Sequence, residues 1–422
     1  MKPTGKEVDP KDRAFGRQVQ QLRKERGMTQ QQLASEMGKT ASWMSQVERG
    51  VQPVERIDVL QELANALGVS VQQLRPGAPL PSATVSNVPE PVYRSNDLDG
   101  ARQLISGHPA IGTILGAVRP TPRRSLDELA DSVDELWRET HEGDFANVSA
   151  HLTDLLPDLE QTVRIVDEPR LATAYLLLSR TYQALAAAFV RQDEADAAWV
   201  AADRAIWAAE KSGDPLQVCA SVFRMVQAFV RLKRLNQAEH SARTAIEALE
   251  ALDGQGTLGV EGMSVLGSLH LGLALVRARA GQRGDAREEL EKARTVAHRI
   301  GEDRNDFNLE FGVTNVEIQA VSTAVELGDA GEALDIGRGI NAEGLSPERQ
   351  GRLLMDLGRA HAQRQQTGEA LACLLRAEEL TPDTVRQHVA ARKAIRDLVR
   401  IEGASAPPEL TALAERADAL EY

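Results

Sequence analysis

Cysteine and aromatic residues are scarce in this sequence of 422 residues. Its two cysteines, Cys219 and Cys373, are too few for a disulfide framework in a chain of this length. We interpret both as small buried residues of a reduced protein. Only 7 Phe, 4 Trp and 4 Tyr are present, which argues against a large β-sandwich core.

Long apolar runs are absent as well. No stretch approaches the roughly 18 uninterrupted apolar residues that a membrane-spanning helix needs. The first residues lack the apolar segment of a secretory signal. The sequence therefore predicts no membrane partner, and we expect a cytoplasmic protein.

Surplus positive charge is the third feature that the whole chain lacks. It has 49 Lys+Arg and 62 Asp+Glu, a net charge of −13, whereas phosphate neutralisation needs a surplus of Lys and Arg. The deficit is uneven, because residues 1–75 carry +3 and the remainder carries −16. The acidic total therefore does not exclude DNA binding by the N-terminal part.

A proline-rich segment separates two helical regions. Residues 76–97 contain five prolines among Gly, Ser, Thr and Asn, so they predict an extended linker. Residues 12–75 precede it, and residues 98–422 follow it with helical periodicity throughout. We find no run of alternating β-branched residues, and the sequence predicts an all-α protein.

Short helices with clear start and stop signals follow one another in the N-terminal region. Thr29 and Gln32 have the spacing of a capping box, in which each side chain satisfies a free backbone amide of the new helix. Glycines at the ends favour helix termination. Apolar residues three or four positions apart indicate five helices, over residues 15–26, 30–37, 40–49, 56–67 and 70–74.

Two short helices joined by a glycine turn are typical of a helix-turn-helix. Several segments here closely resemble the xenobiotic-response-element family of DNA-binding domains, the phage repressor and Cro-like proteins. The matching segments are Leu22-Arg23-Lys24-Glu25-Arg26-Gly27-Met28-Thr29-Gln30, Leu33-Ala34, Gly38, Ser45-Gln46-Val47-Glu48-Arg49-Gly50, Pro53 and Leu63-Ala64-Asn65-Ala66-Leu67-Gly68-Val69. The resemblance implies a five-helix domain whose helix 40–49 enters the major groove of double-stranded DNA.

The same resemblance implies which side chains face the bases. Gln46 can bond adenine through two hydrogen bonds, and Ser42 can bond several bases. Ala41 offers only a methyl contact to thymine, and Lys39 lies beside it. For Trp43 two interpretations stay open: contact with thymine methyls or sugar, or a partly buried prop.

Other residues are expected to contact phosphate or to support the domain. We expect phosphate contacts from Gln30 at its helix N-terminus, from Arg49 and Lys39, and more weakly from Arg17. Arg23 and Glu48 occupy positions that form an ion pair in the lambdoid repressors that the sequence resembles. We interpret them as a structural ion pair.

A helical pattern recurs after about residue 170. A small residue near the start of a helix is followed seven positions later by another small or apolar residue, and successive occurrences lie 40, 48, 47 and 37 residues apart. The pairs are Ala198/Ala205, Ala238/Ala245, Ala286/Ala293, Ala333/Ile340 and Ala370/Ala377. A longer amphipathic helix and a polar break precede each occurrence.

Repeated pairs of antiparallel helices are typical of tetratricopeptide solenoids. The resemblance is loose because the period exceeds the usual figure of about 34 residues, and an irregular helical bundle stays open. The domain order is similar to that of actinobacterial regulators with tetratricopeptide tails and of peptide-pheromone receptors of Gram-positive bacteria.

The sequence offers no support for catalysis, a cofactor or a metal site. The Gly-x-Gly-x-x-Gly match at residues 254–259 follows a helix, whereas a dinucleotide site needs a preceding strand. None of the eight histidines pairs with another at helical spacing, and neither cysteine has a zinc-finger neighbour. An enzyme with a DNA-binding tether therefore has no catalytic group to support it.

These features together predict a sequence-specific transcription regulator that is not an enzyme. One small module with a charge of +3 would bind DNA weakly, so we expect a homodimer held by the repeat domain. The repeats would also sense a peptide, a small ligand or a protein partner. The alternative is an interaction scaffold whose repeats recruit a partner to DNA.

Overall fold

The computed structural model describes residues 10–54, 57–69, 71–75, 96–107, 111–115 and 124–420. Within these ranges the chain is helical without a β-strand, apart from one isolated β-bridge between Arg304 and Phe311. The predicted all-α class is confirmed. None of the helices found in these ranges is long and apolar enough to cross a membrane.

The chain divides into two compact units, which we describe separately. The N-terminal unit comprises Met1–Arg94 with Arg279–Gln282, and the repeat unit comprises Ser95–Ala278 and Arg283–Tyr422. Most of the expected linker, residues 76–95, lies outside the described residues, as does Ser70 at the start of the expected fifth helix.

In the described residues of the N-terminal unit, five helices surround one apolar core. The predicted helix 15–26 begins five residues earlier than expected, and the others agree to within about two residues, the usual uncertainty of helix ends. Leu33, Met44, Val47 and Leu63 are fully buried in this core. The helices are α1 (Pro10–Glu25), α2 (Gln30–Glu36), α3 (Ala41–Glu48), α4 (Ile57–Ala66) and α5 (Val71–Leu74).

The repeat unit contains the remaining helices. Two short 3₁₀ helices, η1 (Asp306–Asn308) and η2 (Gly403–Ser405), lie between them. The α-helices are α6 (Asp99–Ser106), α7 (Ile111–Ile114), α8 (Leu126–Glu142), α9 (Phe145–Thr162), α10 (Glu168–Arg191), α11 (Ala195–Ser212), α12 (Pro215–Arg231), α13 (Leu235–Gly254), α14 (Val260–Arg279), α15 (Arg283–Ile300), α16 (Val313–Leu327), α17 (Ala330–Gly337), α18 (Pro347–Gln363), α19 (Thr367–Leu380), α20 (Pro382–Gln387), α21 (Val389–Glu402) and α22 (Pro408–Arg416).

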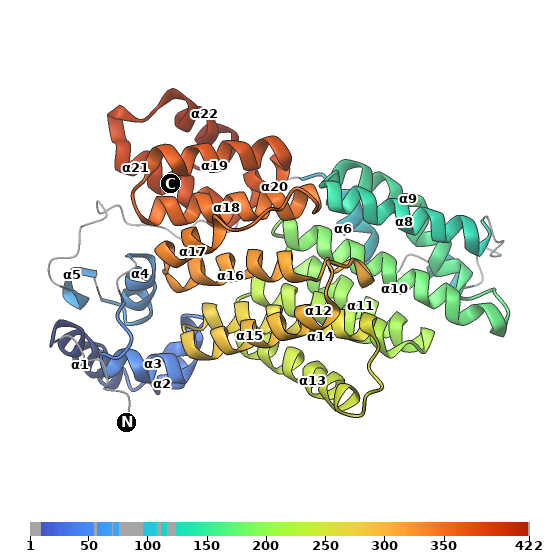
Figure 1. Cartoon of the computed structure of the whole chain (residues 1–422), viewed down its shortest axis with the longest axis horizontal. Helices are drawn as coiled ribbons and strands as arrows, with labels where there is room; N and C mark the ends of the chain where they lie inside the picture. Colours follow the sequence, from blue (N-terminus) through green and yellow to red (C-terminus); the bar gives the residue numbers. More distant parts are fainter. Residues whose placement is uncertain are drawn as a thin grey trace. The chain divides into compact units, whose positions relative to one another are not determined.

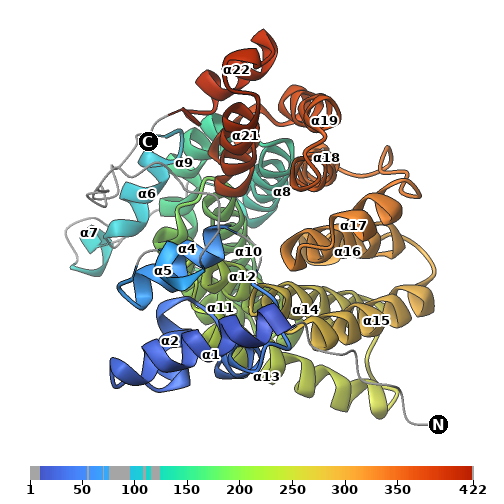
Figure 2. The same cartoon turned by 90° about the vertical axis from the view of Figure 1, so that its left-hand side faces the viewer.

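Consecutive helices of the repeat unit pack in pairs. The pairs α10/α11, α12/α13, α16/α17 and α18/α19 are in direct contact. Helices α14 and α15 form a further pair, in which His270 Nδ1 of α14 lies 2.7 Å from Glu289 Oε2 of α15. Figures 1 and 2 show α14 beside α15 and α18 beside α19. The body is therefore an array of helix pairs.

The recurring small residues lie in the second helix of each pair. The five alanines that begin the pattern are all fully buried. Their small side chains let the backbones of the paired helices approach each other closely. They are Ala198, Ala238, Ala286, Ala333 and Ala370. Ile340, seven positions after Ala333, lies beyond the end of its helix, because α17 ends at Gly337.

Candidate nucleic-acid interface

The turn between α2 and α3 is defined by local hydrogen bonds. Thr29 Oγ1 accepts a hydrogen bond from Gln32 N at 3.1 Å, and Gln32 Oε1 accepts one from Thr29 N at 2.8 Å, so the capping box is present. Gly38 follows α2 with φ of 62°, a left-handed conformation that glycine adopts without steric cost. Thr40 then caps α3 by accepting a hydrogen bond from Trp43 N at 3.2 Å.

Helix α3 presents one polar face and buries the other. Ala41 and Ser42 are exposed in its first turn, and Gln46 is half-buried one turn later on the same face. Trp43 is only 4 % exposed and belongs to the core of the N-terminal unit. Lys39 lies just before α3 with Nζ 5.9 Å from the centre of the Trp43 ring.

A buried ion pair joins α1 to the end of α3. Arg23 Nε lies 2.5 Å from Glu48 Oε1, and Arg23 Nη2 lies 3.1 Å from Glu48 Oε2. Burial by itself would raise the pKa of Glu48, but hydrogen bonds from Arg23 and Gln30 outweigh it and lower that pKa. Glu48 is therefore held as a carboxylate inside the unit.

The residues expected to contact phosphate lie near this ion pair or on the surface. Gln30 is the first residue of α2, and its Nε2 donates to Glu48 Oε2 at 2.8 Å. Arg49 is exposed at the end of α3, where its Nε donates to Ser45 O at 3.2 Å. Arg17 is exposed on α1, and its Nε donates to Arg13 O at 3.3 Å.

Sequence reasoning missed two supporting residues. Gln20 Nε2 donates to Glu48 Oε2 at 3.3 Å, a contact between distant segments that no local pattern signals. Gly16 lies where α1 crosses α3, and a Cβ atom there would come within 2.4 Å of Val47 O. A glycine inside a helix costs stability, so its presence in α1 was a usable signal of close backbone approach.

One group in the described part of the repeat unit has the residue types of a metal site. His141, Glu310 and Glu348 offer ligand atoms that all lie within 4.8 Å of one another, although sequence spacing gave no sign of this grouping. Arg349 and Arg191 form ion pairs with these carboxylates, at 3.1 Å to Glu310 and 3.3 Å to Glu348. The arginines compensate the carboxylates and oppose a bound cation.

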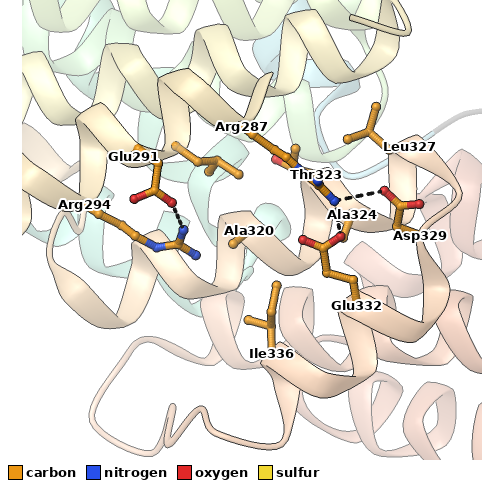
Figure 3. Close-up of a pocket in the computed structure, with 11 residues that line it drawn as sticks. Arg287, Glu291, Arg294, Ala320, Thr323, Ala324, Leu327, Asp329, Glu332 and Ile336 are labelled. Carbon is orange, nitrogen blue, oxygen red and sulfur yellow. Dashed lines mark hydrogen bonds and ion pairs between the residues drawn. The ribbon is translucent and has the colours of Figure 1, made fainter. Parts of the chain in front are cut away.

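The repeat unit also has an open groove between α15, α16 and α17, with a volume of about 180 Å³. Ala320 and Ile336 lie between two charged ends (Figure 3). At one end Arg287 pairs with Glu332, and at the other Arg294 pairs with Glu291. The groove can accept a small apolar group, while both arginines already have carboxylate partners.

Comparison with known proteins gives one family match. Residues 14–76 match the model of a family described as a helix-turn-helix domain. No curated protein sequence matches the chain. A similar solved structure is that of Bacillus thuringiensis PlcR in complex with the peptide PapR7 and DNA, with 13 % identity, a TM-score of 0.36, and coverage of 90 % of this chain and 99 % of that one. By its family match and by the geometry of α2 and α3, the segment 14–76 is a helix-turn-helix domain.

Proposed function

We propose that this protein is a sequence-specific DNA-binding transcription regulator. The observation that carries the proposal is the polar outer face of α3, set on a capped helix-turn-helix that is fixed from behind by Arg23 and Glu48. A helix of this kind places its first turns against base edges in the major groove.

In this proposal the side chains divide into two sets. Ser42 and Gln46 read bases, Ala41 and Lys39 lie beside them, and Trp43 supports the helix from the core. Arg49, Arg17 and the amino end of α2 at Gln30 contact phosphates, which fixes the register of the domain on DNA. The acidic repeat unit repels DNA, so binding is confined to the N-terminal unit.

Selection of bound sequences from random double-stranded DNA with the full chain tests this assignment. Ser42→Ala and Gln46→Ala are expected to reduce discrimination between the selected operator and unrelated DNA. Arg49→Ala is expected to weaken binding to both, and the exposed Glu36→Gln, at the end of α2, serves as the surface control. If Ser42, Gln46 and Arg49 variants all bind like the parent protein, the proposed docking is wrong.

We further propose that the repeat unit forms a homodimer and senses an effector. Two modules on one operator supply affinity that a single weakly basic domain lacks. Sedimentation of the full chain with and without operator tests the dimer, which a strict monomer under both conditions would contradict. A monomer that still binds one half-site would support the alternative, a scaffold that recruits a partner to DNA.

A further inference from the structure

The segment between α15 and α16 departs from ordinary backbone geometry. Phe307, Asn308 and Glu310 have φ of 53°, 55° and 49°, in the left-handed region that non-glycine residues rarely occupy. Each such residue costs on the order of 1–2 kcal/mol unless its surroundings hold it. Leu309 and Phe311 anchor the segment, since they are 1 % and 0 % exposed. Glu310 is therefore held in its left-handed conformation between two anchored neighbours.

Glu310 extends from this strained segment into a set of donors at the amino end of α18. Its Oε2 accepts hydrogen bonds from Arg349 Nε at 3.1 Å and from Ser346 Oγ at 3.1 Å. Its Oε1 accepts one from Ser346 N at 3.3 Å, and His141 Nδ1 lies 3.6 Å from Oε2. A helix amino end with an arginine and a hydroxyl is a complete receptor for one carboxylate.

Positive charge exceeds negative charge around this receptor. Arg191, Arg224 and Arg349 lie near two carboxylates, Glu310 and Glu348. Arg352 also acts on Glu348, but its own partner is Asp356, at 2.9 Å. Burial, followed by the field of nearby Arg191, lowers the pKa of His141 to about 4, so it adds no charge at neutral pH and leaves an excess of one cation.

Arg224 carries this excess. It is 3 % exposed, its Nη2 donates to Asn308 O at 2.8 Å, and its Nε has no hydrogen-bond partner. Aromatic rings of Trp137 and Phe223 lie 5.2 Å and 5.4 Å from its guanidinium, and no carboxylate among the described residues forms an ion pair with it. A buried guanidinium without a paired carboxylate is costly, so the site needs another anion in place of Glu310 whenever that side chain leaves.

We propose that the amino end of α18, with Ser346 and Arg349, is a binding site for the carboxylate of an effector, and that Glu310 is an internal occupant that the effector displaces. Displacement lets Glu310 leave its left-handed conformation, while Leu309 and Phe311 keep the segment anchored. The displaced Glu310 carboxylate turns to solvent, and the effector carboxylate takes over its donors. The proposal rests on the effector-sensing role proposed above, but it is tested without DNA.

The test is rescue of a variant by small carboxylates. Glu310→Gly removes the carboxylate and permits the positive φ, so it empties the site without adding strain. Acetate is expected to raise the Tm of this variant saturably, by about 2–4 °C, and chloride at equal ionic strength is not. In the double variant Glu310→Gly/Arg349→Met the acetate effect is expected to disappear. A Tm of the single variant that responds equally to acetate and chloride would overturn the proposal.

A second measurement uses the unmodified full chain. The Glu310 amide donates to Asn305 Oδ1 at 3.1 Å, so its hydrogen exchange reports whether Glu310 has left its place. Acetate, succinate and trialanine with a free carboxy terminus are the probes, and the amidated tripeptide is the control. We expect faster hydrogen exchange in residues 305–311 with the carboxylate probes and not with the amidated control. The most effective probe then shows whether the site prefers a small acid or the carboxy terminus of a peptide. Unchanged exchange at saturating acetate overturns the proposal, even where the variant is rescued, and leaves Glu310 as a structural counter-ion.

Discussion

Arg23 of α1 and Glu48 of α3 form a two-point ion pair whose side chains are 9 % and 1 % exposed. Gln20 and Gln30 donate to the same carboxylate, so α1, the amino end of α2 and the end of α3 meet at one buried group. Arg23 Nη1 also donates to Met28 O at 2.6 Å, which fixes the turn between α1 and α2. The orientation of α3 therefore depends on this pair.

Removing one partner of the Arg23–Glu48 ion pair should lower the free energy of unfolding more than removing both partners. Arg23→Met leaves Glu48 buried without its cation, and we expect a loss of about 3–5 kcal/mol in the free energy of unfolding of the N-terminal unit. The double variant Arg23→Met/Glu48→Met should recover much of that loss. Hydrogen exchange of the α3 amides in the full chain measures both, with the exposed Arg17→Ala as control. Equal losses in the single and double variants would contradict the prediction.

Gly16 should not tolerate even a methyl group. A Cβ atom there would lie 2.4 Å from Val47 O and 2.6 Å from Glu48 O, both backbone atoms that no rotamer change can move. We expect Gly16→Ala to destabilise the N-terminal unit by about 1–3 kcal/mol, as overpacking does. At Gly27 the added Cβ meets nothing within 4 Å, so Gly27→Ala should cost only its left-handed φ of 67°. Hydrogen exchange of the α1 and α3 amides compares the stability of the two variants. An equal loss of stability in both would show that α1 can move away from α3.

The helices of the N-terminal unit could be predicted because their signals are local. The capping residues Thr29 and Thr40 act within three positions of themselves, and glycines end the helices within one turn. The contact of Gln20 with Glu48 could not be predicted from the sequence, because it depends on how α1 crosses α3. The sequence predicts a phosphate contact for Gln30, and its hydrogen bond to Glu48 gives it a structural contact as well.

In the repeat unit, too, local sequence signals predict the helices but not the contacts between distant segments. The small residues Ala198 and Ala238 indicated the helix pairs correctly, because close packing of paired helices has a regular spacing. His141, Glu310 and Glu348 come from three distant segments, and the backbone between α15 and α16 that brings Glu310 there is left-handed. Periodicity in sequence contains no information about such a segment.

Phosphate and base contacts should differ in their dependence on salt. Arg49→Ala is expected to lower the slope of log K against log salt by about 1, because one fewer counterion is released. Gln46→Ala is expected to cost about 1–3 kcal/mol on the selected operator with an unchanged slope. Fluorescence anisotropy over a series of salt concentrations measures both. An Arg49 variant with the parent slope would remove Arg49 from the phosphate contacts.

The repeat unit should lose stability at mildly acidic pH because of His141. Burial, and then the field of Arg191, lowers the pKa of His141 to about 4, whereas in the unfolded chain it lies near about 6.5. Between these values the unfolded state binds more protons, so the contribution of His141 is fully present above 6.5 and is lost as pH falls towards 4. The free energy of unfolding should decrease by about 2 kcal/mol between pH 7.5 and 5. Burial alone would raise the pKa of Glu348, but Arg191 and Arg349 lower it to about 2. Glu348 therefore loses its contribution to stability only below about pH 4.5, outside the pH range in which His141 acts.

Urea unfolding followed by circular dichroism measures the decrease that is due to His141, and His141→Gln should remove it. The same decrease in that variant would assign it to other groups.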